Sequence, residues 1–213
     1  MTVTDILTFV FVTSLLVMSP GLNGVLILRT VPTSGRSAGF ACIAGFVAAF
    51  YMHGTFAVFG ISVILIQSAT TFTIVKILGA AYLCWIGVKA LIAAFKGAKG
   101  SADVAPAQKR RTNRKAFFEG FLTNGLNPKV SMFYLAAFPQ FITTGETSTA
   151  SAYLLVALHS MIATLWFGAL ALLFAKLTSI TRTGHFQRWL KGVTGIVFIG
   201  FGAKLATIRA GSL

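Results

Sequence analysis

Residues 117–143 read FFEGFLTNGLNPKVSMFYLAAFPQFIT, an apolar stretch interrupted near its centre by Asn127-Pro128-Lys129. A membrane-spanning helix needs about 20 predominantly apolar residues, so this stretch is long enough to cross a bilayer. A proline inside a helix removes one backbone hydrogen bond and clashes with the preceding turn. In lipid, backbone groups freed in this way are tolerated where they are buried in protein or line a cavity. The stretch therefore predicts a membrane span that is broken at a buried position.

Five more stretches of the chain have a similar length and composition. They cover residues 6–28, 38–66, 72–95, 150–176 and 189–208. The chain of 213 residues is 56% hydrophobic and only 10% charged, whereas soluble domains carry about 25% charged residues. We therefore expect an all-α, polytopic membrane protein with six transmembrane helices, which form a single transmembrane domain over residues 1–213.

Among the connections between the predicted spans, lysines and arginines occur only in alternate ones. They occur in or beside the connections that follow the first, third and fifth spans, whereas the other two connections hold none. Cytoplasmic loops of membrane proteins carry an excess of Lys and Arg. We therefore expect the basic loop at residues 96–116 to be cytoplasmic and both termini to lie outside. No basic segment is long or aromatic enough to predict nucleic-acid binding, although the net charge is +14.

The two halves of the chain are similar to each other. Ser19-Pro-Gly-Leu-Asn23 and Thr123-Asn-Gly-Leu-Asn-Pro-Lys129 each hold Gly-Leu-Asn beside a proline. Lysines and glycines also recur at similar spacings in the third and sixth predicted spans. A repeat of three helices reverses its direction in the membrane, so the pattern predicts a 3+3 inverted repeat with halves at about residues 1–95 and 117–213. The alternative is chance similarity between apolar segments.

A pair of interrupted helices is the best indication that a sequence gives of a transporter's binding site. The candidate residues lie at and beside the two interruptions and are Pro20, Gly21, Asn23, Asn124, Asn127, Pro128 and Lys129. The asparagine amides can donate and accept hydrogen bonds beside the freed backbone. The alternative is a pair of proline kinks whose asparagines serve only to pack helices.

Ionisable groups inside predicted spans are costly and usually mark function. Lys129 would suit the carboxylate of a substrate or act as a fixed counter-charge; alternatively, its ammonium pairs with carbonyls of a broken helix. His53 and His159 are candidates for a proton relay, or they are hydrogen-bonded packing residues. No Asp or Glu lies deep within a predicted span. This pattern favours a neutral, zwitterionic or anionic solute over a cationic one.

Other chemistries have no recognisable motif in the chain. It contains no nucleotide-binding Gly-x-x-x-x-Gly-Lys-Ser/Thr, no His-Glu-x-x-His and no Gly-x-Ser-x-Gly. Cys42 and Cys84 lie in separate apolar stretches without the spacing of metal ligands. We therefore expect no enzyme, cofactor or metal site, and a channel, a non-transporting scaffold or a membrane redox relay remain as alternatives. Small residues four apart, such as Gly35 and Gly39, would permit close helix packing or a homo-oligomer.

Several motifs resemble those of the lysine exporter/homoserine-threonine exporter (LysE/RhtB) family. Met18-Ser-Pro-Gly-Leu-Asn23 resembles the family's Pro-Gly-Pro-Asn signature. Residues 76–87 are similar to its third-helix block, and residues 118–129 with 138–141 are similar to its fourth-helix block. The resemblance implies a bacterial inner-membrane exporter of amino acids or their derivatives, driven by an ion gradient. The expected coupling ion is a proton.

The chain departs from the family's pattern at two places. Leu22 stands at the second proline of the signature, and Ala49 and Phe50 stand about where many members carry Gly-Asp ahead of His53. Without that carboxylate, recognition of a cationic cargo is not expected. We therefore predict secondary-active export of a neutral amino acid or derivative. The two repeats would rock about a central site and so provide alternating access.

Overall fold

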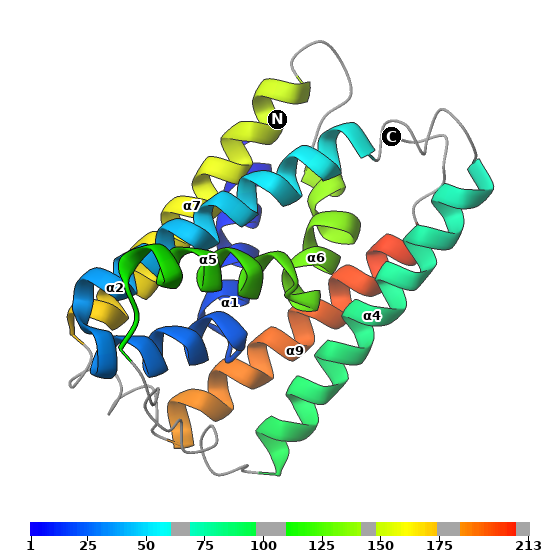
Figure 1. The fold of residues 1–213 in the computed structure, drawn as a ribbon. Helices are drawn as coiled ribbons and strands as arrows, with labels where there is room; N and C mark the ends of the chain where they lie inside the picture. The colour runs from blue at the N-terminus through cyan, green and yellow to red at the C-terminus, as the bar shows by residue number, and fades with distance from the viewer. Residues whose placement is uncertain (61–68, 97–109, 142–147, 174–183, 208–213) are drawn as a thin grey trace.

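The computed structural model describes residues 1–60, 69–96, 110–141, 148–173 and 184–207. Within these ranges the chain is helical and contains no strand (Figure 1). The α-helices are α1 Val3–Met18, α2 Leu22–Thr55, α4 Ala69–Phe95, α5 Asn113–Gly125, α6 Pro128–Met132, α7 Ser148–Leu172 and α9 Gly184–Thr207. Shorter helical segments continue α2 and α6, namely η1 Phe56–Gly60, η2 Phe133–Ala137 and η3 Phe138–Phe141. The all-helical class predicted from the sequence is confirmed.

Three helices in the described ranges are long and apolar enough to cross a membrane, by length and composition. They cover Leu22–Phe59, Ile77–Phe95 and Thr149–Leu172. Two further helices, Val3–Met18 and Lys191–Gly200, are apolar but shorter. Four predicted connections lie wholly or partly outside the described residues, at 67–71, 96–116, 143–149 and 178–188. The cytoplasmic placement of the basic loop therefore stays a prediction.

The first predicted span, residues 6–28, is divided between two helices. α1 ends at Met18, and α2 begins at Leu22 after an extended Gly21. Pro20 prevents α1 from continuing, because proline has no backbone N–H and its ring clashes with the preceding turn. The interruption predicted at this position is confirmed.

The sequence Val31-Pro-Thr-Ser-Gly-Arg36, between the first two predicted spans, predicts a turn, but this prediction is wrong in its extent. Helical geometry continues through Pro32 and is lost only at Gly35, which has φ of 85° and ψ of 173°. Backbone in this region is essentially restricted to glycine, because a Cβ would be strained there. The segment after Gly35 carries the second predicted span as far as Gly60. Its last residues, 61–66, lie outside the described residues.

The predicted span at residues 117–143 is also broken. α5 ends at Gly125, and α6 begins at Pro128. Pro128 occupies the first helical position, where a missing N–H leaves no hydrogen bond unmade. Asn127 caps α6 by accepting a hydrogen bond from the backbone N–H of Lys129. Figure 1 shows α5 running across the bundle and α6 rising steeply from its end.

α5 packs closely against α2 through a stripe of small residues. Ala116, Gly120 and Asn124 are buried at a spacing of four residues on one face of α5. A Cβ on Gly120 would collide with the backbone of Cys42, so this approach requires glycine. The other side of the helix exposes the apolar Phe118. The helix therefore buries its small side chains against protein and presents a large one outward, as expected of a helix that borders lipid.

α4 and α9 form an antiparallel pair at one side of the molecule (Figure 1). Gly87 of α4 lies against the backbone of Gly195 in α9. Nearer the end of α4, Arg188 Nε donates to the carbonyl of Ala94 at 3.0 Å. Arg188 already lies inside α9, so the connection predicted to extend to residue 188 ends sooner than expected.

The core lies where α1, α2, α7 and the segments after α6 meet. Phe9 of α1 packs against three phenylalanines of η2 and η3, with ring centroids 6.1, 6.1 and 5.2 Å away at Phe133, Phe138 and Phe141. All four side chains are buried. Aromatic pairs in these arrangements stabilise by about 0.5–1.5 kcal/mol beyond the area they bury. The contacts hold the middle of α1 against the segments that follow α6.

Candidate functional site

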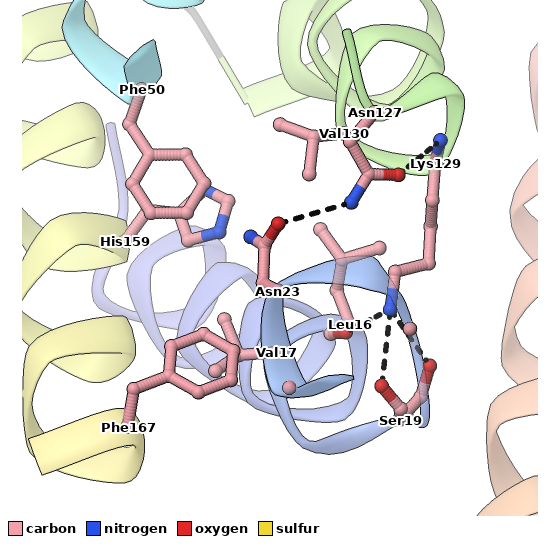
Figure 2. Close-up of a pocket in the computed structure, with 12 residues that line it drawn as sticks. Leu16, Val17, Ser19, Asn23, Phe50, Asn127, Lys129, Val130, His159 and Phe167 are labelled. Atoms are coloured by element: carbon pink, nitrogen blue, oxygen red, sulfur yellow. Dashed lines mark hydrogen bonds between the residues drawn. The ribbon is translucent and has the colours of Figure 1, made fainter. Parts of the chain in front are cut away.

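The two interruptions lie next to each other, and their asparagines form hydrogen bonds (Figure 2). Asn127 Nδ2 donates to Asn23 Oδ1 at 3.4 Å. Asn23 Nδ2 in turn donates to Asn124 Oδ1 at 2.9 Å. The last residues of the two Gly-Leu-Asn motifs are thus in contact, although they are 104 residues apart in the sequence.

Backbone groups at both ends fix the direction of this chain of amides. The Lys129 N–H donates to Asn127 Oδ1 at 3.1 Å, and Asn124 Nδ2 donates to the Phe46 carbonyl at 2.8 Å. A backbone N–H can only donate and a carbonyl can only accept. Each amide between them must therefore turn its oxygen towards Lys129 and its nitrogen towards Phe46. The asparagines are buried, so each lost partner would leave an unsatisfied polar group.

The Lys129 ammonium closes the C-terminal end of α1 (Figure 2). Nζ donates to the Leu16 carbonyl at 2.9 Å and to the Ser19 carbonyl and Oγ, both at 3.1 Å. Pro20 has no N–H, so the Leu16 carbonyl four residues before it lacks its helical donor. A cation at a helix C-terminus is also favoured by the helix dipole. All three N–H groups of the ammonium are occupied in this arrangement.

A pocket with a volume of about 300 Å³, which includes its open side, lies between the interruptions and α7. The enclosed cavity within this space is about 20 Å³, which is room for about one water molecule, so a larger solute can bind only when the pocket widens. The twelve lining residues are Leu16, Val17, Ser19, Gly21, Asn23, Gly24, Phe50, Asn127, Lys129, Val130, His159 and Phe167. None of these twelve is an Asp or a Glu. The pocket therefore combines apolar walls with amide, ammonium and imidazole groups.

His159 lines the pocket from α7 and has a free ring nitrogen. Its Nδ1 lies 3.2 Å from the Tyr134 hydroxyl. Its Nε2 is buried and has no hydrogen-bond partner among the described residues. Phe50 covers the imidazole, with a distance of 4.2 Å between ring centroids. A buried polar atom without a partner is rare in native proteins and requires an explanation.

The structure brings five of the nine predicted site residues to the pocket wall: Gly21, Asn23, Asn127, Lys129 and His159. The other four do not line the pocket. Pro20 and Pro128 are exposed and act only by ending or starting a helix. Asn124 is fully buried in the amide chain behind the pocket. His53 also lies behind the pocket, with Nε2 3.3 Å from the Asn124 carbonyl.

Ser19 and Tyr134 belong to the site but were not singled out from the sequence. Ser19 supplies two of the three acceptors for Lys129, and its position directly before Pro20 was a usable signal. Tyr134 lies between the two histidines, with ring centroids 5.6 Å from both His53 and His159. In the sequence, a single tyrosine within an apolar stretch looks the same whether it belongs to a functional site or only to the packed core.

The two cysteines are free and belong to helix contacts. Cys42 is buried against Gly120 of α5. Cys84 Sγ lies 3.9 Å from the Ile199 carbonyl of α9. Cys42 Sγ itself lies 4.0 Å from Thr30 Oγ1 within α2, so both cysteines are accounted for by helix packing, which is the usual role of buried free cysteines.

Comparison with known proteins relates the chain to membrane transporters. The model of the family described as LysE type translocator matches residues 14–209. A threonine efflux protein of Escherichia coli (strain K12) is 27% identical over 95% of this chain and 98% of its own length. A leucine efflux protein of Klebsiella pneumoniae is 30% identical over 98% of this chain and 97% of its own length. An uncharacterized membrane protein of Bacillus subtilis (strain 168) is 29% identical over 94% of this chain and 97% of its own length. No solved structure matches the chain.

Proposed function

The chain belongs to the LysE type translocator family, and from this membership we propose that it exports an amino acid or a close derivative across the bacterial inner membrane. The observation that carries the proposal is similarity along nearly the whole chain to proteins named for threonine and leucine efflux. The family is one of membrane transporters, and the apolar helices of this chain agree with a multi-pass membrane protein.

The proposed cargo is a neutral amino acid, held in the pocket between the two interruptions. The pocket contains no carboxylate that could pair with a cationic side chain. Its apolar wall includes Val17, Phe50 and Phe167, which suits an aliphatic side chain. Asn23 and Asn127 can offer a second amide N–H or a second oxygen lone pair to the polar end of the cargo.

The proposed mechanism is alternating access by two inverted repeats of three spans each, giving six spans in one domain. Contacts between corresponding elements support this arrangement. Asn23 and Asn127 are equivalent in the two motifs and hydrogen-bond to each other. Gly87 of α4 and Gly195 of α9 belong to the third predicted span of each half and pack backbone to backbone. A Cβ added to either glycine would lie 2.7 Å from the carbonyl oxygen of the other. Contacts between the corresponding spans of the two halves are expected when a pseudo-twofold axis relates halves that rock about a central site.

The proposed coupling ion is a proton, with His53 and His159 as its carriers. Both histidines are buried, and both stack on Tyr134. Histidine is the side chain best suited to exchange protons near neutral pH. The proposed orientation has both termini outside and the basic loop at residues 96–116 in the cytoplasm, as the distribution of Lys and Arg indicates.

Efflux from preloaded cells tests the proposed function. Cells that express the protein would be loaded with labelled L-leucine, L-threonine and L-lysine, and efflux would be followed with and without an uncoupler. We expect faster efflux of a neutral amino acid, its loss on uncoupling, and no effect on lysine. Equal efflux from cells with and without the protein in the membrane would contradict export. Faster efflux that the uncoupler leaves unchanged would instead favour a channel.

A further inference from the structure

We propose that His159 donates a hydrogen bond from Nε2 to the carboxylate of the transported amino acid, and that Tyr134 positions it to do so. The inference rests on the proposed function and identifies the group that recognises the cargo within its pocket. It gives His159 a binding role in addition to the proposed exchange of protons.

His159 is a polar group of the pocket with a ring nitrogen that has no hydrogen-bond partner among the described residues. The Lys129 ammonium donates its three N–H groups to the Leu16 carbonyl and to the carbonyl and hydroxyl of Ser19. Every amide nitrogen and oxygen of Asn23 and Asn127 already has one partner in the amide chain, although each nitrogen keeps a second N–H. The Nε2 atom of His159 is buried and unpartnered among the described residues. A solute that enters the pocket would satisfy this atom without breaking any contact that holds the two interrupted helices.

Tyr134 determines which ring nitrogen of His159 carries the proton. The Tyr134 side chain is buried, and within the described ranges its hydroxyl has His159 Nδ1 as its hydrogen-bond partner at 3.2 Å. A buried hydroxyl proton without an acceptor costs about 1–3 kcal/mol, so the hydroxyl donates and Nδ1 accepts. In a neutral imidazole the other nitrogen then bears the hydrogen. Nε2 is consequently a donor, and its natural partner is an oxygen of the solute.

The surroundings of His159 suit a carboxylate whose side chain points to an apolar wall. Figure 2 shows His159 beneath Phe50, facing the same space as Asn23 and Asn127. The Lys129 ammonium lies at the edge of this space. Its positive charge favours an anion nearby even without a direct contact, because interactions between charges are strong at sites shielded from water. A carboxylate held by His159 would therefore be stabilised both by the hydrogen bond from Nε2 and by the positive charge of Lys129.

Two substitutions of His159 separate recognition from packing. In His159→Asn the amide oxygen falls near the position of Nδ1 and keeps a partner for Tyr134, whereas the amide nitrogen ends about one bond short of the position of Nε2. The amide of His159→Gln reaches the position of Nε2 and can restore that donor. The neighbouring Ser160 has a buried hydroxyl without a described partner and does not line the pocket. Ser160→Ala is therefore the matched control.

The measurement is binding to purified protein in detergent, with two pairs of probes: L-leucine against 3-methylbutylamine, and L-threonine against 1-aminopropan-2-ol. Each amine lacks the carboxylate of its partner. We expect wild type and Ser160→Ala to prefer the acid by about tenfold or more, as a hydrogen bond to a charged group would provide. The preference should fall by about tenfold in His159→Asn, fall less in Tyr134→Phe and return in part in His159→Gln; the Lys129 charge accounts for any preference that remains.

The outcomes distinguish this inference from the proposed function. An unchanged preference in folded His159→Asn overturns the inference, and so does a wild-type protein that binds neither amino acid or shows no preference for the acid. If cells still export the amino acid in those cases, export stands without this contact. A preference that depends on His159 in a protein that exports nothing would support the inference and overturn export.

Discussion

At the scale of single residues, Lys129 is the side chain whose environment most changes its interpretation. A cation inside a span suggests an anionic partner, but here the partners are backbone carbonyls at the end of α1. The proline that removes one helical donor and the lysine that replaces it lie in opposite halves of the chain. The hydrogen bonds between Lys129 and the end of α1 therefore join the two interruptions. We expect their loss to lower the stability of the folded protein.

Replacing Lys129 with methionine should destabilise the protein. The change keeps a long apolar side chain but leaves the Leu16 and Ser19 carbonyls without their donor, at a cost of about 1–3 kcal/mol. We expect a lower midpoint of thermal unfolding in detergent for Lys129→Met. Lys115→Met is the control, because Lys115 is exposed at the start of α5. Equal midpoints for Lys129→Met and wild type would show that the contacts at the end of α1 contribute little.

The fixed direction of the amide chain predicts unequal effects for two Asn→Asp substitutions. In Asn124→Asp, an oxygen replaces the nitrogen that donates to the Phe46 carbonyl, so two acceptors face each other. In Asn127→Asp, the oxygen that caps α6 is kept, aspartate is a good N-cap, and the donor that is lost belongs to the longer bond of 3.4 Å to Asn23 Oδ1. Thermal unfolding and yield of folded protein should therefore fall more for Asn124→Asp. A larger loss for Asn127→Asp would show that the hydrogen bond to Asn23 contributes more to stability than the one to the Phe46 carbonyl.

At the scale of helices, the sequence predicts where the chain breaks better than it predicts how the pieces are arranged. Proline beside Gly-Leu-Asn located both interruptions, because the cost of proline in a helix is local. The break at Gly35 was expected as a turn of six residues, since a positive φ at one glycine cannot be seen in composition. Packing of α5 across α2 depends on contacts between distant residues, which the sequence does not reveal.

Gly35→Ala tests the single-residue break within α2. The glycine has a φ of 85°, and a side chain held in this region costs about 1–3 kcal/mol. Among the described residues, nothing lies within 4 Å of a Cβ built on Gly35, so we expect any loss to reflect backbone strain rather than a clash. Gly200→Ala is a suitable control, because it lies in α9 and has equal space. We expect a lower unfolding midpoint for Gly35→Ala only.

Part of the candidate site could be predicted from the sequence. Some residues belong to a recognisable motif, whereas the role of others depends on neighbours that only folding brings together. Asn23, Asn127 and Lys129 follow from the repeated motif, because polar groups beside a broken helix in lipid need partners. Tyr134 could not be found in this way, because its role depends on the positions of His53 and His159 in the folded chain. The direction of the hydrogen bonds likewise depends on backbone groups brought together only by folding.

At the scale of the whole molecule, elements from both halves meet at one small pocket. α1 and the start of α2 come from the first half, and α6 and α7 come from the second. A movement between the halves would change the pocket and the hydrogen bonds across it together. This is the property that alternating access requires of a central site.

The proposed orientation can be tested with one new cysteine at a time, in a protein with Cys42→Ser and Cys84→Ser. Arg114 is exposed at the start of α5, and Thr149 is exposed at the start of α7. In intact cells, a membrane-impermeant thiol reagent should label Thr149→Cys and spare Arg114→Cys, because the basic loop before α5 is expected inside. Labelling of both should follow when the membrane is opened. The reverse pattern would invert the orientation.

The most direct test of the account is transport by the purified protein in liposomes loaded with labelled L-leucine or L-threonine. Wild type and Ser160→Ala should release the amino acid, whereas Asn127→Ala, folded and inserted to the same extent, should release it at least about tenfold more slowly. The substitution removes one group that faces the cargo and that also links the two interruptions. Release by Asn127→Ala at the wild-type rate would contradict the claim that transport proceeds through this pocket.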